Sequence, residues 1–126
     1  MKKFIIVLVI FTFLTALIVT HSIVMYRFGR DAEKICAKIE EDAMADRWEE
    51  TEKGLDRLKS LWEKKRLWAT LTLRTNVIEE IDITLAQSKA HAKTKQKPDF
   101  LGEFIKLKLV FEHIPRQEGL SLEEIL

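Results

Sequence analysis

The sequence contains one cysteine, two prolines and four glycines in 126 residues. A single cysteine excludes a disulfide within the chain, and it excludes a zinc site built from several thiolates. So few prolines and glycines, together with 33% charged residues, are typical of an ordered helical protein. The formal net charge of +1 also argues against the strongly basic surface that nucleic-acid-binding proteins carry.

The sequence also lacks the motifs of common catalytic sites. It has no nucleophile elbow and no glycine-rich phosphate loop. His21, His91 and His113 have no carboxylate or second histidine at metal-ligand spacing, apart from Glu112 beside His113. We therefore expect no catalytic residue, no metal, no cofactor and no enzymatic activity. Cys36 is expected to be a half-buried helix residue, or a residue that crosslinks two chains outside the cell.

A long apolar run opens the chain. Residues 4–25 carry no charge, and 15 of them are Leu, Ile, Val or Phe. As a helix they would span about 33 Å, enough for a hydrocarbon core of about 30 Å. A cleaved signal peptide is the alternative, but the run is long and no small-x-small cleavage site follows it. Residues 1–28 are therefore predicted to form an uncleaved membrane anchor with a short basic N-terminus.

Two further features of the anchor bear on its orientation and packing. Basic residues flank the run on both sides, so the positive-inside rule does not decide the topology. The short basic start is typical of an exported anchor, which predicts a cell-membrane protein with residues 29–126 outside the cytoplasm. Thr12, Ala16 and Thr20 lie four apart on one stripe, where small side chains would let another membrane helix approach. Small residues are common in such segments, so a stripe without a function is the alternative.

After the anchor, the apolar residues follow a helical period. Met44, Trp48, Thr51, Leu55, Leu58 and Trp62 are spaced alternately four and three apart. The pattern predicts helices over about 31–71, 76–95 and 99–114, with Pro115 ending the third. Ser121 and Glu124 would form a capping box for a last turn. The predicted fold class is all-α: an N-terminal transmembrane helix, then an antiparallel three-helix hairpin or bundle with a short C-terminal helical turn.

The tryptophans are either a core or a binding surface. Trp48 and Trp62 share their seam with leucines, and the later helices offer matching apolar faces, which favours the core. Trp68 is also expected in the core, but it follows the basic residues Lys64, Lys65 and Arg66. These four residues are therefore the candidate surface for a partner protein or a lipid.

The stretches "RWEETEKGLDRLKSLWEKKRLWA", "IDITLAQSKAHAKTK" and "LKLVFEHIPRQEGLSLEEIL" carry a family resemblance over essentially the whole chain. The chain resembles an uncharacterised family of small anchored proteins of spore-forming bacteria, known as a domain of unknown function. The resemblance implies a multi-span YetF-like membrane protein as partner, because members are often encoded beside one. The most specific positions are Trp48, Trp62, Trp68, Ile81, Asp82, Leu85 and residues 112–115. The family often has His-x-Glu where this chain reads Thr75-Asn76-Val77.

These observations favour a non-enzymatic accessory subunit of a membrane protein complex. Its anchor would pack on a larger integral partner in the lipid bilayer, and the chain could also form homo-oligomers. The alternative is an extracytoplasmic module that senses or binds a ligand near Trp68 and Lys64 to Arg66.

Overall fold

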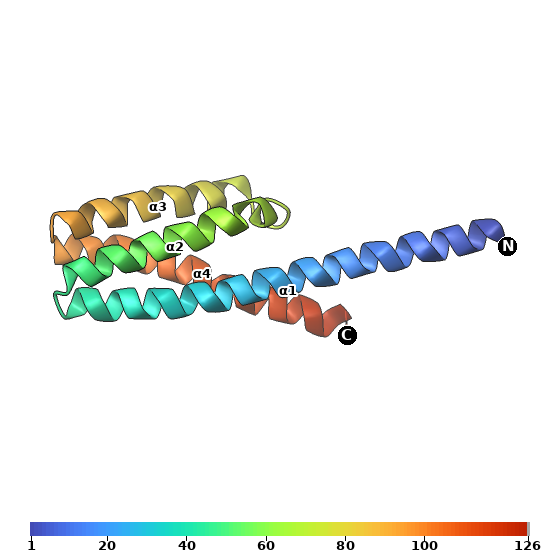
Figure 1. Cartoon of the computed structure of the whole chain (residues 1–126), viewed down its shortest axis with the longest axis horizontal. Helices are drawn as coiled ribbons and strands as arrows, with labels where there is room; N and C mark the ends of the chain where they lie inside the picture. The colour runs from blue at the N-terminus through green and yellow to red at the C-terminus, as the bar shows by residue number, and fades with distance from the viewer. Residues whose placement is uncertain (126) are drawn as a thin grey trace.

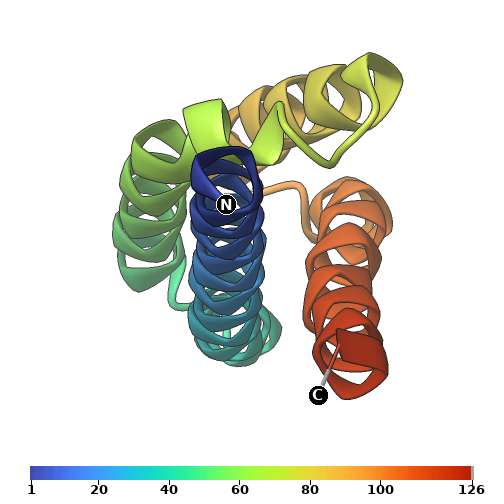
Figure 2. The same ribbon diagram turned by 90° about the vertical axis from the view of Figure 1, so that its right-hand side faces the viewer.

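The chain forms four α-helices in the computed structural model, which describes the backbone of residues 1–125 and the side chains of residues 1–114. They are α1 (Lys2–Met44), α2 (Trp48–Ala69), α3 (Thr75–Lys93) and α4 (Lys97–Ile125). Successive helices run antiparallel, and α1 packs on α2 and α4, while α3 packs on the other sides of the same two helices (Figures 1 and 2). The all-α class and the bundle are confirmed, and no strand occurs in residues 1–125.

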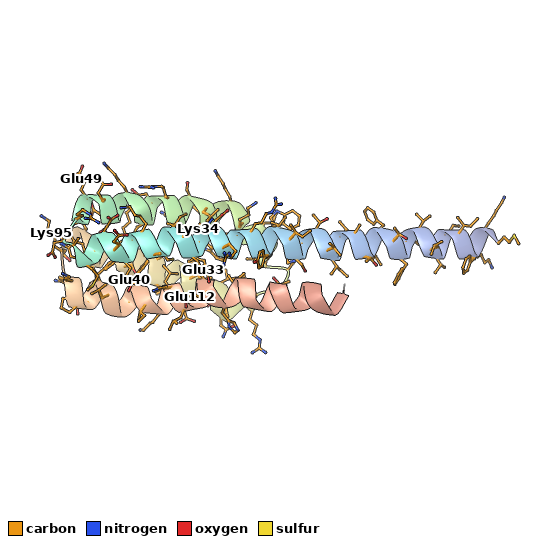
Figure 3. All side chains as sticks on the ribbon, turned by 90° about the horizontal axis from the view of Figure 1, so that it is seen from below. Glu33, Lys34, Glu40, Glu49, Lys95 and Glu112 are labelled. Atoms are coloured by element: carbon orange, nitrogen blue, oxygen red, sulfur yellow. The ribbon has the colours of Figure 1, made fainter. Side chains whose placement is uncertain are left out.

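Helix α1 has two halves with different surroundings. Residues 4–20 project from one end of the bundle, and most of their side chains are exposed (Figures 1 and 3). From His21 onward one face is buried, including Met25, Phe28 and Ala32. The helix passes through Gly29 without interruption, so the apolar run and the first wall of the bundle form one rod.

The predicted single helix over 31–71 is wrong, because the chain turns back at residues 45–47. Asp46 adopts the left-handed conformation, with φ of 58°. The Arg47 amide donates to the Asp42 carbonyl at 2.8 Å, which closes the C-terminal turn that commonly ends helices. Lys95, with φ of 57°, ends α3 in the same way. Part of the predicted first helix therefore belongs to α1, and the bundle has four helices.

Asp42 holds this turn from inside. Its side chain is nearly fully buried, and its Oδ1 accepts hydrogen bonds from Lys38 Nζ at 3.1 Å and Arg47 Nε at 3.0 Å. Burial alone would raise the pKa of Asp42, but the hydrogen bonds from Lys38 and Arg47 outweigh it and hold that pKa below its ordinary value. This carboxylate thus stabilises the fold above the ordinary carboxyl pKa, and the contribution is lost as pH falls through the lowered value.

The core is aromatic along its length. Phe28 of α1 contacts Phe111 edge-on at a centroid distance of 5.7 Å and Trp62 at 5.9 Å. Toward the other end, Trp48 meets Phe100 edge-on at 5.7 Å. Trp62 is 1% exposed and Trp48 is 9% exposed, which confirms that both lie in the interior.

Helix α4 continues beyond its predicted end. The expectation that Pro115 ends the helix is wrong, since α4 begins at Lys97 and runs to Ile125. Ser121 and Glu124 therefore do not begin a separate turn, and their side chains lie outside the described residues. On the surface, Lys89 of α3 forms an ion pair with Asp56 of α2, with an N–O distance of 3.0 Å.

Gly54 marks the closest approach of α1 and α2. A Cβ at this position would lie 2.6 Å from Cγ1 of Ile39, a fully buried side chain. Atoms at that distance overlap, and a branched residue locked in a packed core has little room to move. Gly54 is thus required by packing, although from the sequence it is only a weak point in a helix.

We predict that Gly54→Ala destabilises the fold by about 1–2 kcal/mol, because overpacking outweighs the gain of up to about 1 kcal/mol in helix propensity. Gly102→Ala is the matched control, since a Cβ added at this glycine would meet no atom within 4 Å. This control should gain up to about 1 kcal/mol. Urea denaturation of both full-length variants in one detergent measures the difference, and a Gly54→Ala protein as stable as Gly102→Ala would contradict the packing role.

Candidate functional site

The residues expected to contact a partner gather where the exposed half of α1 leaves the bundle. We call this region the exit end; it comprises residues 21–30 of α1 and residues 64–74, which are the last turns of α2 and the following loop. Trp68, in the last turn of α2, packs against α1 here. His21 Nε2 donates a hydrogen bond to the Trp68 carbonyl oxygen at 2.8 Å, and the centroids of the two rings are 5.8 Å apart. The indole remains 38% exposed, so the expectation that Trp68 lies in the core is wrong: its ring contacts His21 on one side only. Trp68 therefore joins α2 to the rod and still presents a face outward.

Arg66 points to the other side of α2. Its Nη2 donates to Asp82 Oδ2 at 2.8 Å, and the other carboxylate oxygen of Asp82 accepts the Trp62 indole N–H at 2.6 Å. Burial opposes ionisation of Asp82, but the hydrogen bonds from Arg66 and Trp62 hold its pKa below the ordinary value. The same pair raises the pKa of Arg66. Asp82 thus fastens α3 to α2 over the buried Trp62.

The four residues of the candidate surface do not form one patch. Arg66 is held against α3, while Trp68 contacts α1. Lys64 is exposed and Lys65 is half-buried. No role was predicted for Asp82, because nothing in the sequence around a single acidic residue indicates its partners on another helix. The one indication that Asp82 has a role was that it belongs to the most specific positions of the family resemblance.

Thr12, Ala16 and Thr20 lie together along one side of the projecting half of α1. A shallow trough there is lined by Phe11, Thr15 and Val19 as well as by these three residues. The Thr12 hydroxyl donates to the Leu8 carbonyl at 2.9 Å, and Thr15 donates to Phe11 in the same way. The hydroxyls of Thr12 and Thr15 are thus satisfied within the helix, so these two residues can face a neighbouring helix in lipid without an unpaired polar group.

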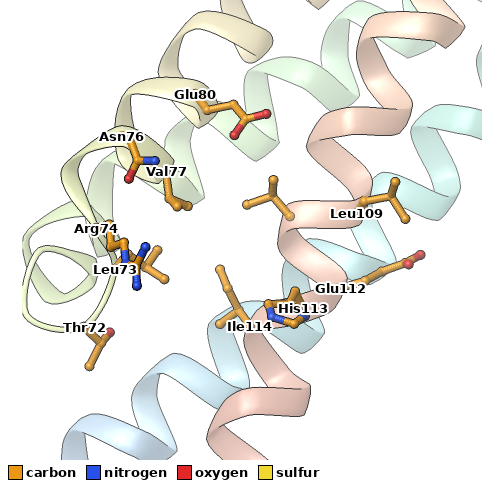
Figure 4. A pocket seen from close by; sticks show the side chains of 11 residues that line it. Thr72, Leu73, Arg74, Asn76, Val77, Glu80, Leu109, Glu112, His113 and Ile114 are labelled. Atoms are coloured by element: carbon orange, nitrogen blue, oxygen red, sulfur yellow. The ribbon is translucent and has the colours of Figure 1, made fainter.

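A cleft of ≈ 680 Å³ opens between α3 and α4, next to the loop of the exit end. Figure 4 shows Arg74 and Val77 on one side and His113 and Ile114 on the other. The cleft has an aliphatic floor. Its rim carries both charge signs, with Arg74 positive and Glu80 and Glu112 negative. Val77, one of the two positions at which the sequence departs from the pattern of the resemblance, lines this cleft. Its size and lining suit a small molecule with both apolar and polar groups.

Metal-ligating side chains and the cysteine are the two remaining kinds of group that could take part in chemistry. Among residues with described side chains, no three His, Cys, Asp or Glu residues are placed to hold a metal ion. Cys36 is fully buried rather than half-buried, and burial raises its pKa to about 12. Its thiol is therefore protonated at neutral pH and shielded from oxidants and from a second chain.

The fold and the exit end define a helical bundle carried on a long apolar N-terminal helix. One helix, α1, is long and apolar enough to cross a membrane, a property that signal sequences share. The chain belongs to the family described as a domain of unknown function (DUF4363), which matches residues 24–125. The match covers the bundle and leaves out most of the apolar run. No curated protein and no solved structure matches the chain.

We predict that Asp82→Ala destabilises the fold by about 1–2 kcal/mol, because it leaves the Trp62 N–H without its acceptor and removes the partner of Arg66. Partial solvent exposure of the carboxylate places the loss toward the lower figure. The stabilisation should be present above the ordinary carboxyl pKa and disappear as pH falls through the lowered pKa of Asp82.

Asp56→Ala is the matched control for this change, since it breaks only an exposed ion pair with Lys89. It should cost at most about 0.5 kcal/mol. Urea denaturation at neutral and acid pH compares the two variants. Equal losses for Asp82→Ala and Asp56→Ala would show that Asp82 has no special role in joining α2 and α3.

Proposed function

We propose that this protein is a membrane-anchored, non-enzymatic interaction subunit of a larger membrane protein complex. Residues 4–20 of α1 cross the bilayer beside an integral partner, and the bundle stands outside the cytoplasm. The observation that carries the proposal is the continuity of α1: its first half exposes apolar side chains on all sides, while its second half is a wall of the core. Exposed apolar surface of that extent is stable in lipid and not in water.

A subunit of this shape acts through contacts in two places. The trough along Thr12, Ala16 and Thr20 offers the anchor a face for close helix packing. The bundle then moves with the anchor, because no hinge separates the two halves of α1. The proposed partner is a YetF-like multi-span protein, a choice that rests on the family resemblance.

The test is affinity purification of the tagged full-length protein from native membranes in mild detergent. We expect a stoichiometric integral membrane protein to accompany it. The triple variant Thr12→Leu, Ala16→Leu and Thr20→Leu should lose that partner at least about tenfold, because bulky side chains fill the trough. Carbonate extraction checks that the variant remains in the membrane.

The control places extra bulk on the opposite face of the same helix, with Leu14→Phe and Ile18→Phe. It should retain the partner, since its trough is intact. Recovery of the wild-type protein alone, or equal recovery of the partner by the triple variant and the control, would refute the proposed packing face.

The alternative is a ligand-binding module, and the observation that favours it is the cleft between α3 and α4. The cleft lies beside Arg74 and His113, on another side of the bundle from the surface expected from sequence. Asn76→Trp would fill the cleft from an exposed position at the start of α3. For a sensor, this variant should lose its cellular phenotype while the integral partner is recovered unchanged; an unaffected phenotype would count against ligand sensing.

A further inference from the structure

We propose that the exit end of the bundle rests on the bilayer surface, with Leu67, Trp68 and Leu71 inserted at the boundary between lipid headgroups and acyl chains. The proposal deepens the proposed function and depends on its membrane anchor. It adds a second membrane contact, made by the bundle itself, and it identifies the occupant of this apolar surface as lipid.

The two most exposed apolar side chains of the exit end lie within five consecutive positions, with Trp68 between them, and Ile23 and Tyr26 of α1 add to this surface. Leu67 is 79% exposed, Leu71 is 71% exposed and Trp68 is 38% exposed. Leu67 and Trp68 belong to the last turn of α2, and Leu71 lies in the loop that follows. Met44 and Ile83, which are exposed apolar residues elsewhere on the bundle, stand singly, as is normal on a protein surface, while Ile105 and Leu109 form a pair one turn apart on α4. A cluster at a helix end calls for a specific partner.

The height of this cluster along α1 is fixed by a hydrogen bond. His21 Nε2 donates to the Trp68 carbonyl at 2.8 Å, and the two rings pack 5.8 Å apart. His21 directly follows residues 4–20, which are the part of the apolar run that the bundle leaves uncovered. Those 17 residues have a helical length of about 26 Å, slightly less than a hydrocarbon core of about 30 Å. A bilayer that covers them must therefore reach the level of Trp68.

The charges of the exit end fit a phospholipid surface. Residues 64–78 contain four basic residues and no acidic one, and residues 21–30 contain two arginines and no acid. Arg66 and Arg30 have carboxylate partners within the protein. Lys64, Arg27 and Arg74 are exposed, and their long side chains can reach phosphate groups while their stems stay near the acyl chains. Tryptophan beside cations at a hydrocarbon boundary is the usual composition of a membrane-interface layer.

Continuity identifies lipid rather than a protein as the occupant. The cluster adjoins a segment that already requires lipid around it, and the rod brings both to one surface without a linker. The bundle would thus sit directly on the membrane instead of standing away from it.

The test measures the depth of single labelled cysteines in the full-length protein, reconstituted in vesicles of phosphatidylcholine and phosphatidylglycerol. The native Cys36 is buried and its pKa is about 12, so the wild-type chain serves as the unlabelled background. Leu71→Cys carries an NBD fluorophore at the exit end. Lipids with a nitroxide just below the headgroup should quench this label at least about twofold, because it lies within the interface.

Two control positions separate this proposal from the anchor itself. Glu49→Cys lies at the opposite end of the bundle, where the side chain is 85% exposed (Figure 3), and its label should be unaffected by the nitroxide lipids. Ile10→Cys lies within the anchor and should be quenched by nitroxides deep in the acyl chains. If Ile10→Cys is quenched while Leu71→Cys behaves like Glu49→Cys, the anchor stands and the surface contact is refuted. If Ile10→Cys is not quenched, both the anchor and the surface contact are refuted.

Discussion

The structure depends on α1 remaining one helix from its apolar start to its end at Met44. The same helix carries exposed apolar side chains in its first half and side chains that fill the core in its second half. Phe28 is locked between Trp62 and Phe111, so α1 cannot rotate about its axis without displacing rings on two other helices. The orientation of the first half is therefore set by packing in the second half.

The location of the exit end follows from this packing. Gly54 lets α2 approach α1 closely, and Asp82 fastens α3 to α2 through the Trp62 indole. These contacts bring the last turn of α2 against His21, which gives the Trp68 carbonyl its donor. The apolar cluster at the loop is thus held at a defined height on the rod by the core, and not by contacts of its own. A partner or a membrane meets a preformed surface.

The sequence predicted the helical class, the burial of Trp48 and Trp62 and the turn between α2 and α3, because the period of the apolar residues is a local signal. It did not predict the turn at Asp46, since that left-handed residue is neither Gly nor Asn and no Pro follows it. Glycine is unfavourable inside a helix, yet Gly29 and Gly54 are both buried and lie inside unbroken helices. At these two positions tertiary packing outweighs the local preference. The backbone of α4 also continues through Pro115.

The candidate site was less predictable than the fold for the same reason. The basic residues next to Trp68 are a prediction from neighbouring positions in the sequence, but whether each cation is free depends on partners distant in the chain. Arg66 is held by Asp82, 16 residues away, and only the folded arrangement shows that Lys64 remains available. The cleft beside Arg74 arises where α3 and α4 diverge, which no periodicity in either helix encodes.

Because α1 has no hinge, a tilt of its apolar half also tilts the bundle. From His21 to Met44 the helix extends about 35 Å beyond the apolar run, so a change in tilt of about 10° would move its far end by about 6 Å. Contact between the exit end and lipid would resist such tilting, because it requires apolar side chains to leave the interface on one side. The bundle would then respond to a membrane partner chiefly when that partner supplies enough contact along the anchor to overcome this resistance. In the proposed complex, the protein would therefore act by transmitting changes of position along α1.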